Sequence, residues 1–85
     1  MFSFEITQED IHQGLRRRAN NCPVTIAVRR ALNTYQVTTG PNGTMVGEEE
    51  NYDSYTHSEE LKWFIFLFDK GLTVKPGIYS MELVR

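Results

Sequence analysis

Alternating apolar and polar residues predict four short strands along the chain. Within positions 2–6 every second residue is apolar, which is typical of a strand with one buried face. Residues 35–39 alternate in the same way and are rich in strand formers. The turn sequence of residues 40–43 then predicts a tight hairpin, with a returning strand over residues 44–46. Alternation resumes in residues 78–84, which predicts the last strand.

Two helices are expected between the first strand and the hairpin. Thr7 fits an N-cap, acidic residues follow it in the first turn, and Gly14 stops the helix after about two turns. Pro23 fits the first position of a second helix, where its missing N–H leaves no backbone partner unsatisfied. On this second helix an apolar face is expected to pack on the core, with Thr25 pointing elsewhere. Asn33 is expected to end it.

A third helix is predicted over residues 58–70. Thr56 and Glu59 fit a capping box at its start, and Gly71 fits its C-terminal stop. This helix carries large apolar residues on two sides, which is too much apolar surface for packing on one sheet. We therefore expect a second contact surface, supplied by the first helices or by another copy of the chain. The predicted interface of a homo-oligomer consists of Ile26, Trp63, Phe66 and Leu67.

The order strand, helices, hairpin, helix, strand predicts an α+β fold. We expect a small antiparallel sheet of three to four strands with two or three helices packed on one face. The 85 residues form one domain, residues 1–85, because a chain of this length builds only one modest core. Residues 48–53 are acidic, and we expect them to form a loop or a frayed edge.

Composition favours a cytoplasmic protein that does not enter a membrane. The longest apolar run, residues 63–68, is far shorter than the roughly 20 residues of a membrane-spanning helix. The opening residues lack the basic start and apolar stretch of a secretion signal. A single cysteine cannot form an internal disulfide, which also favours a reducing compartment.

Basic residues are concentrated in the first half of a chain whose net charge is −2. Five of the nine fall within residues 16–30, and all five are arginines, whose planar guanidinium groups suit phosphate oxygens. The loop before Pro23 also brings backbone N–H groups to a positive helix end. These features predict a site for an anionic ligand, formed by Arg16, Arg17, Arg18, Asn21, Arg29 and Arg30. The alternative is that the last two arginines pair with the protein's own acids and that the triplet is a solvated loop.

Acidic residues are concentrated in the second half, where they predict a face for a basic partner. In this interpretation the carboxylates imitate a phosphate backbone and occupy a basic groove of another protein. General acid–base catalysis would require a pocket that raises the pKa of one carboxyl group, and a solvated loop is the simplest alternative. The residues of this face are Glu48, Glu49, Glu50 and Asp53.

Catalytic and metal-binding patterns are weak in this sequence. Cys22 at a helix start near Arg18 has the position of an activated thiol, and His12 or His57 is a candidate base. The spacing of these residues matches no nucleophile signature, so we expect Cys22 to cap the helix and to be buried. Paired metal-ligand spacings such as CxxC or HxxxH are absent from the sequence. We therefore predict a protein that is not an enzyme and that uses no metal or cofactor.

A resemblance to a group of short proteins supplies a context. The segment Asn21-Cys22-Pro23-Val24-x-x-Ala27-x-x-x-Ala31-Leu32, preceded by Ile11-x-x-Gly14, resembles a motif of short uncharacterised bacteriophage and mobile-element proteins. The ending Phe64-x-x-x-Phe68-Asp69-x-Gly71, followed by Lys75-Pro76 and a strand, is similar to theirs as well. The resemblance implies a compact accessory protein, in the host cytoplasm if it is viral, and no known activity.

Two functions are predicted from these features. The first is a small non-enzymatic binding protein that acts against host defence by sequestering an anionic nucleotide-type ligand or a nucleic acid. The second is an anti-CRISPR-like protein–protein inhibitor, whose acidic segment 48–53 would occupy a basic groove of a host effector.

Overall fold

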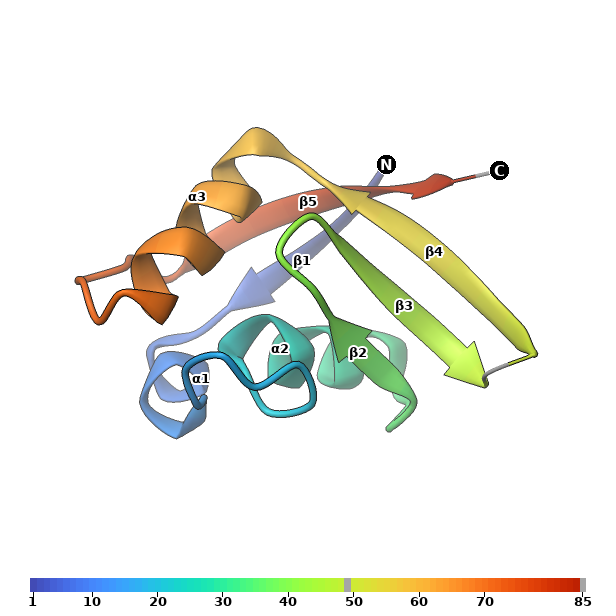
Figure 1. Cartoon of the computed structure of the whole chain (residues 1–85), viewed down its shortest axis with the longest axis horizontal. Coiled ribbons are helices and arrows are strands. Elements are labelled where there is room, and N and C mark those ends of the chain that lie inside the picture. The colour runs from blue at the N-terminus through green and yellow to red at the C-terminus, as the bar shows by residue number, and fades with distance from the viewer. Residues whose placement is uncertain (49, 85) are drawn as a thin grey trace.

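The computed structural model describes residues 1–48 and 50–84, which form a five-stranded antiparallel sheet and three helices (Figure 1). The order of strands across the curled sheet is β1-β5-β4-β3-β2. The strands are β1 (Phe2–Ile6), β2 (Val37–Thr39), β3 (Gly43–Glu48), β4 (Asn51–His57) and β5 (Gly77–Val84). The helices are α1 (Gln8–Gln13), α2 (Pro23–Leu32) and α3 (Glu59–Asp69).

The predicted α+β class is confirmed, but the predicted number of strands is too small. Residues 51–57 form β4, which lies between β3 and β5, whereas the sequence predicts a loop or a frayed edge over residues 48–53 and no strand here. Only Tyr55 and His57 of this strand contribute side chains to the interior, so its sequence is nearly all polar. Residues 51–53 at the outer end of β4 are exposed at three successive positions, so neither face of the strand packs on the core there and no alternation arises.

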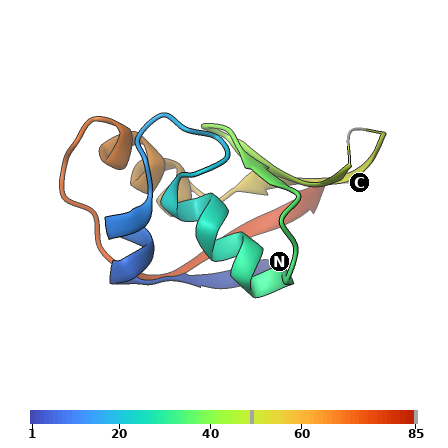
Figure 2. The ribbon, with the colours of Figure 1, turned by 90° about the horizontal axis from the view of Figure 1, so that it is seen from below.

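The three helices lie on the same side of the sheet, and the core fills the space between them (Figure 2). Inward-facing side chains alternate along β1 and β5, and α3 packs Phe64 edge-on against Tyr79 of β5 at 5.1 Å between ring centroids. One face of the sheet packs against the helices, and the other face is turned away from the core. This explains why apolar and polar residues alternate in residues 2–6. The buried core consists of Phe4, Ile6, Cys22, Val24, Ala27, Val28, Val37, Leu61, Phe64, Phe68 and Met81.

Polar side chains and one glycine define the helix ends. Thr7 and Asp10 form a reciprocal capping box at the start of α1, as Thr7 at the N-cap predicted. The cap of α3 is Ser58, whose hydroxyl accepts from the Leu61 N–H, so the predicted box with Thr56 is wrong. Gly71 has a positive φ of 80° directly after α3, which confirms it as the C-terminal stop.

β3 and β4 continue beyond the rest of the sheet as a two-stranded hairpin. Among the described residues, β4 pairs with β5 from Ser54 onward, whereas the β3–β4 pairing extends outward to Glu48 and Asn51. The tip of the hairpin and helix α3 lie at opposite ends of the long axis (Figure 1). None of the helices in the described part of the chain has the length and hydrophobicity needed to cross a bilayer.

Candidate anion-binding groove

The arginine loop, residues 14–22, is fixed to the body of the protein at several points. The carbonyl of Ala19 accepts the Thr39 N–H at 3.0 Å and also bonds the Thr25 hydroxyl at 2.6 Å. The side chain of Asn20 bonds the Thr38 hydroxyl at 3.3 Å. These contacts join the loop to both α2 and β2, so the loop is a positioned part of the fold.

Arg17 carries the contact that brings this loop to helix α3. Its backbone N–H donates to the Asp69 carboxylate at 2.9 Å, across 52 positions of sequence. The residue has a φ of 58°, a left-handed conformation that is uncommon for residues other than glycine. Since such a conformation costs energy, the contacts of the surrounding residues must hold it. This contact places the arginine loop beside the last turn of α3.

The outer side of α3 exposes two aromatic rings to solvent. Trp63 is 59 % exposed and Phe66 is 50 % exposed, and the two rings meet edge to face at 5.6 Å between centroids. The ammonium group of Lys70 lies 5.1 Å from the centroid of the Phe66 ring, which is a cation–π contact. The helix therefore presents apolar rings and positive charge together.

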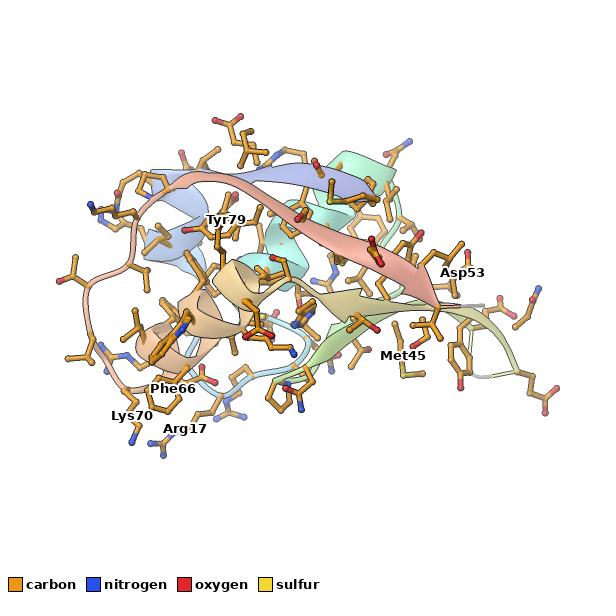
Figure 3. The ribbon with its side chains drawn as sticks, turned by 90° about the horizontal axis from the view of Figure 1, so that it is seen from above. Arg17, Met45, Asp53, Phe66, Lys70 and Tyr79 are labelled. Carbon is orange, nitrogen blue, oxygen red and sulfur yellow. The ribbon has the colours of Figure 1, made fainter. Side chains whose placement is uncertain are left out.

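A groove of about 520 Å³ lies between this aromatic surface and the arginine loop. Its volume falls within the range of small-molecule sites, and its walls combine apolar rings with a few charged groups, as ligand sites do. Figure 3 shows Arg17, Phe66 and Lys70 at the same end of the molecule, with both charged side chains reaching outward. The groove is lined by Arg17, Pro41, Asn42, Glu59, Lys62, Trp63, Ile65, Phe66, Asp69 and Lys70.

A narrower hollow of about 230 Å³ adjoins the groove. The two hollows lie side by side and have four lining residues in common, which are Arg17, Pro41, Ile65 and Asp69. The narrower hollow reaches the start of α2 at Cys22 and is also lined by Arg18. A ligand that extends from the aromatic rings into this hollow would pass two guanidinium groups.

Two carboxylates also lie in the groove, and each has a partner. Glu59 lies 3.4 Å from the Lys62 ammonium group, as an exposed ion pair one helical turn apart. Asp69 accepts the Arg17 N–H. An exposed pair of this kind contributes little to stability, so Lys62 can exchange it for another anion.

The structure does not bring the five predicted arginines together. Arg30 lies near the end of α2, where its guanidinium group holds the Asp10 carboxylate at 2.7 and 2.8 Å. Arg29 donates to the Tyr35 carbonyl at 3.1 Å. Arg16 packs its guanidinium group against Gly71, on the other side of the loop from the groove. Only Arg17 and Arg18 of the predicted set line the groove and its adjoining hollow.

The Arg30–Asp10 pair is the internal pairing that the sequence left as an alternative. Asp10 is only 3 % exposed, and its burial raises its pKa. Hydrogen bonds from Arg30 and from Thr7 outweigh this effect, so the pKa of Asp10 is lowered below its usual value. The charge of Arg30 is thus neutralised within the protein.

Asn21 does not present the free backbone N–H that the sequence predicted. Its N–H donates to the Arg18 carbonyl at 3.0 Å, and its carbonyl accepts from Leu15 at 2.8 Å. These bonds close the arginine loop on itself before α2 begins.

Lysines, which the sequence analysis overlooked, take the place of the missing arginines. Lys62, Phe66 and Lys70 follow one another at intervals of four residues on α3. Residues four apart share a helix face, so this spacing places both lysines on the side of α3 that carries the exposed ring. That spacing was the signal that could have identified them.

Cys22 and His57 are connected only through a chain of buried threonine hydroxyls. Cys22 is the N-cap of α2, as predicted, and its sulfur contacts the Thr25 hydroxyl at 3.3 Å. Thr25 is fully buried, so the expectation that it points away from the core is wrong. Its hydroxyl bonds Thr39 at 2.8 Å, Thr39 contacts Thr44 at 3.4 Å, and Thr44 bonds His57 Nε2 at 2.7 Å. The thiol and the imidazole therefore do not form a direct nucleophile–base pair.

His57 is held in its neutral form by its surroundings. It is 4 % exposed, and Nδ1 has no hydrogen-bond partner among the described residues. Burial, with a smaller contribution from Lys62, lowers the pKa of His57 to about 4, while the Pro41 backbone acts in the opposite direction. Burial therefore keeps the His57 imidazole uncharged at neutral pH.

The predicted acidic face lies at the tip of the β3–β4 hairpin. Glu48, Glu50 and Asp53 are all exposed, and Figure 3 shows Asp53 toward the opposite end of the molecule from Arg17 and Phe66. Glu49 lies outside the described residues. Of the predicted oligomer interface, Trp63 and Phe66 are exposed, whereas Leu67 and Ile26 are half-buried.

Comparisons of this chain with protein families, with curated proteins and with solved structures found no match. The resemblance to bacteriophage proteins therefore stays a prediction. Among the described residues, His, Cys, Asp and Glu side chains form no group of three or more that could hold a metal ion.

Proposed function

We infer that this chain is a non-enzymatic binding protein that holds an anionic, nucleotide-type ligand in the groove between the arginine loop and α3. The observation that carries this inference is the hydrogen bond from the Arg17 N–H to the Asp69 carboxylate. It joins a cationic loop to a helix whose outer side exposes Trp63 and Phe66. A ligand with both a flat apolar part and negative charge matches such walls.

The charge of the groove walls supports an anion as the occupant. Three cationic side chains line the larger part of the groove, and Arg18 lines the narrower part. Glu59 and Asp69 offset two of these four positive charges, so the walls keep a net positive charge. Guanidinium and ammonium groups that flank aromatic rings favour phosphates attached to an unsaturated ring. The larger part is lined by Arg17, Lys62 and Lys70.

A binding role requires no reacting side chains in the groove. Cys22 touches only the narrower hollow and is nearly buried, and His57 lies beneath the surface. Sequestration of a ligand, which the sequence analysis predicted as a means of acting against host defence, depends on affinity alone.

Titration calorimetry at low ionic strength tests this function. The panel comprises inorganic polyphosphate, thymidine oligonucleotides and cyclic oligonucleotides. We expect binding of at least one member that weakens as salt is added, because phosphate contacts release counterions. The double variant Arg17→Ala/Lys70→Ala should lose this binding, whereas Lys75→Ala, a cation outside the groove, should retain it. Absence of binding across the panel would reject the function.

A further inference from the structure

We propose that the groove binds single-stranded nucleic acid, with a base stacked on Trp63 and the backbone running past Arg17 toward the narrower hollow. This proposal rests on the proposed function and names its ligand. It follows from three features: the exposed ring pair, the placement of the cations, and the second hollow that adjoins the groove.

The ring pair offers a platform for a base. Trp63 and Phe66 meet edge to face with an interplanar angle of 86°, so each ring supports the other while the two remain half-exposed. An edge-to-face pair leaves ring faces available to a further flat group. Base stacking on exposed aromatic side chains is the main attraction in single-strand binding and accepts any base.

The cations lie where a backbone that leaves this platform would pass. Lys62 and Lys70 lie one turn before and one turn after Phe66 on the same side of α3. Arg17 faces them from the loop across the groove. A strand whose base rests on the rings would therefore have phosphates within reach of both walls.

The position of Arg18 favours a strand over a free mononucleotide. The larger hollow holds the ring pair, whereas the narrower one beside it has no aromatic side chain and is lined by Arg17, Arg18 and Asp69. Arg18 thus adds a second arginine beyond the ring pair, on the side where the next phosphate of a strand would lie. A nucleotide joined to a second phosphate can reach both arginines, whereas a nucleoside has no phosphate for either.

Trp63 is the only tryptophan in the chain, so its fluorescence reports on the platform directly. The experiment titrates the full chain with thymidine mononucleotide, dinucleotide, tetranucleotide and octanucleotide, and with an abasic phosphodiester octamer. We expect quenching by the oligonucleotides, with affinity that rises from the mononucleotide to the tetranucleotide. Labelled-strand anisotropy should show a loss of about 5- to 150-fold for Trp63→Leu. Tyr35→Ala, which removes an exposed ring outside the groove, should bind normally.

Each other outcome overturns the proposal in a defined way. If the abasic octamer binds with the same affinity as the thymidine octanucleotide, base stacking is rejected and the anion-binding function remains intact. Equal affinity for mononucleotide and tetranucleotide would assign the groove to a free nucleotide. Self-association through Trp63 that persists with saturating oligonucleotide, measured by light scattering, would assign the rings to a second copy. Absence of binding to every probe would reject the proposed function as well.

Discussion

The backbone N–H of Arg17 donates to the side chain of Asp69 at 2.9 Å, and this bond joins the arginine loop to the last turn of α3. Arg17 adopts a left-handed conformation to make it. The residue therefore has two separable roles, because its backbone fixes the loop and its side chain supplies charge to the groove.

Replacing Arg17 separates these roles. Arg17→Gly removes the side chain and accepts a φ of 58° without strain, whereas Arg17→Ala removes the side chain and keeps the strain. We expect both variants to bind anionic ligands weakly. The glycine variant should have a free energy of unfolding about 1 kcal/mol higher than that of the alanine variant. Urea denaturation of the two proteins measures the difference, and a less stable glycine variant would contradict the assigned backbone role.

Lys70 should contribute to affinity through charge alone. Lys70→Ala is expected to reduce the slope of log affinity against log salt by about 0.7, the value for one phosphate contact on a single strand. Anisotropy titrations at several salt concentrations give the slope. Lys75→Ala is the matched control, since this lysine lies outside the groove, and its slope should equal that of the unmodified protein.

The Arg30–Asp10 pair should contribute to stability and not to ligand binding. Arg30→Ala leaves a nearly buried carboxylate with the Thr7 N–H as its hydrogen-bond donor, so we expect a loss of about 1–3 kcal/mol in the free energy of unfolding. Arg29→Ala removes one exposed hydrogen bond to a backbone carbonyl and should cost less than about 1 kcal/mol. Chemical denaturation compares the two variants. A binding defect in folded Arg30→Ala would contradict the separation of this arginine from the groove.

His57 should make the protein sensitive to acid. Its pKa is lowered from 6.5 to about 4 in the folded state, so the unfolded chain takes up a proton first as the pH falls. The stability conferred by neutral His57 is therefore complete above pH 6.5 and is lost progressively down to pH 4, by about 3 kcal/mol. Urea midpoints measured across this interval test the prediction.

A variant of His57 serves as the control for this pH dependence. His57→Gln should flatten the dependence between pH 6.5 and pH 4. Asp10 affects stability in a lower pH range. Its pKa is lowered in the folded state, so the stability that it confers is complete above its ordinary pKa of 3.8 and is lost as the pH falls further. A stability that does not change down to pH 4 would contradict the buried, neutral His57.

Local sequence patterns predicted the elements that carry strong periodicity or caps. The strand over residues 2–6, the helix from Pro23 and the stop at Gly71 all follow from short-range preferences. β4 was missed because the partners that make its polar residues a strand, β3 and β5, lie elsewhere in the sequence. The burial of Thr25 was missed for the same reason, since its hydroxyl partners include Thr39 of β2.

The candidate site was predictable only in part. The arginine triplet and the exposed rings of α3 were identifiable separately, but nothing local connects Arg17 with Asp69. The sequence also offered no means to distinguish Arg30, which pairs internally, from Arg18, which lines the hollow. Charge counts do not show which cations are already neutralised by a folded partner.

The most direct test of the account is a titration of ¹⁵N-labelled protein with thymidine tetranucleotide, followed by NMR. We predict that the Trp63 indole N–H and the backbone amides of Arg17, Arg18 and Lys70 shift together and saturate at one equivalent. The amides of the hairpin tip, residues 48–53, should not move. Shifts confined to that hairpin, or unchanged signals from the Trp63 indole and Arg17 at saturating ligand, would contradict the groove as the binding site.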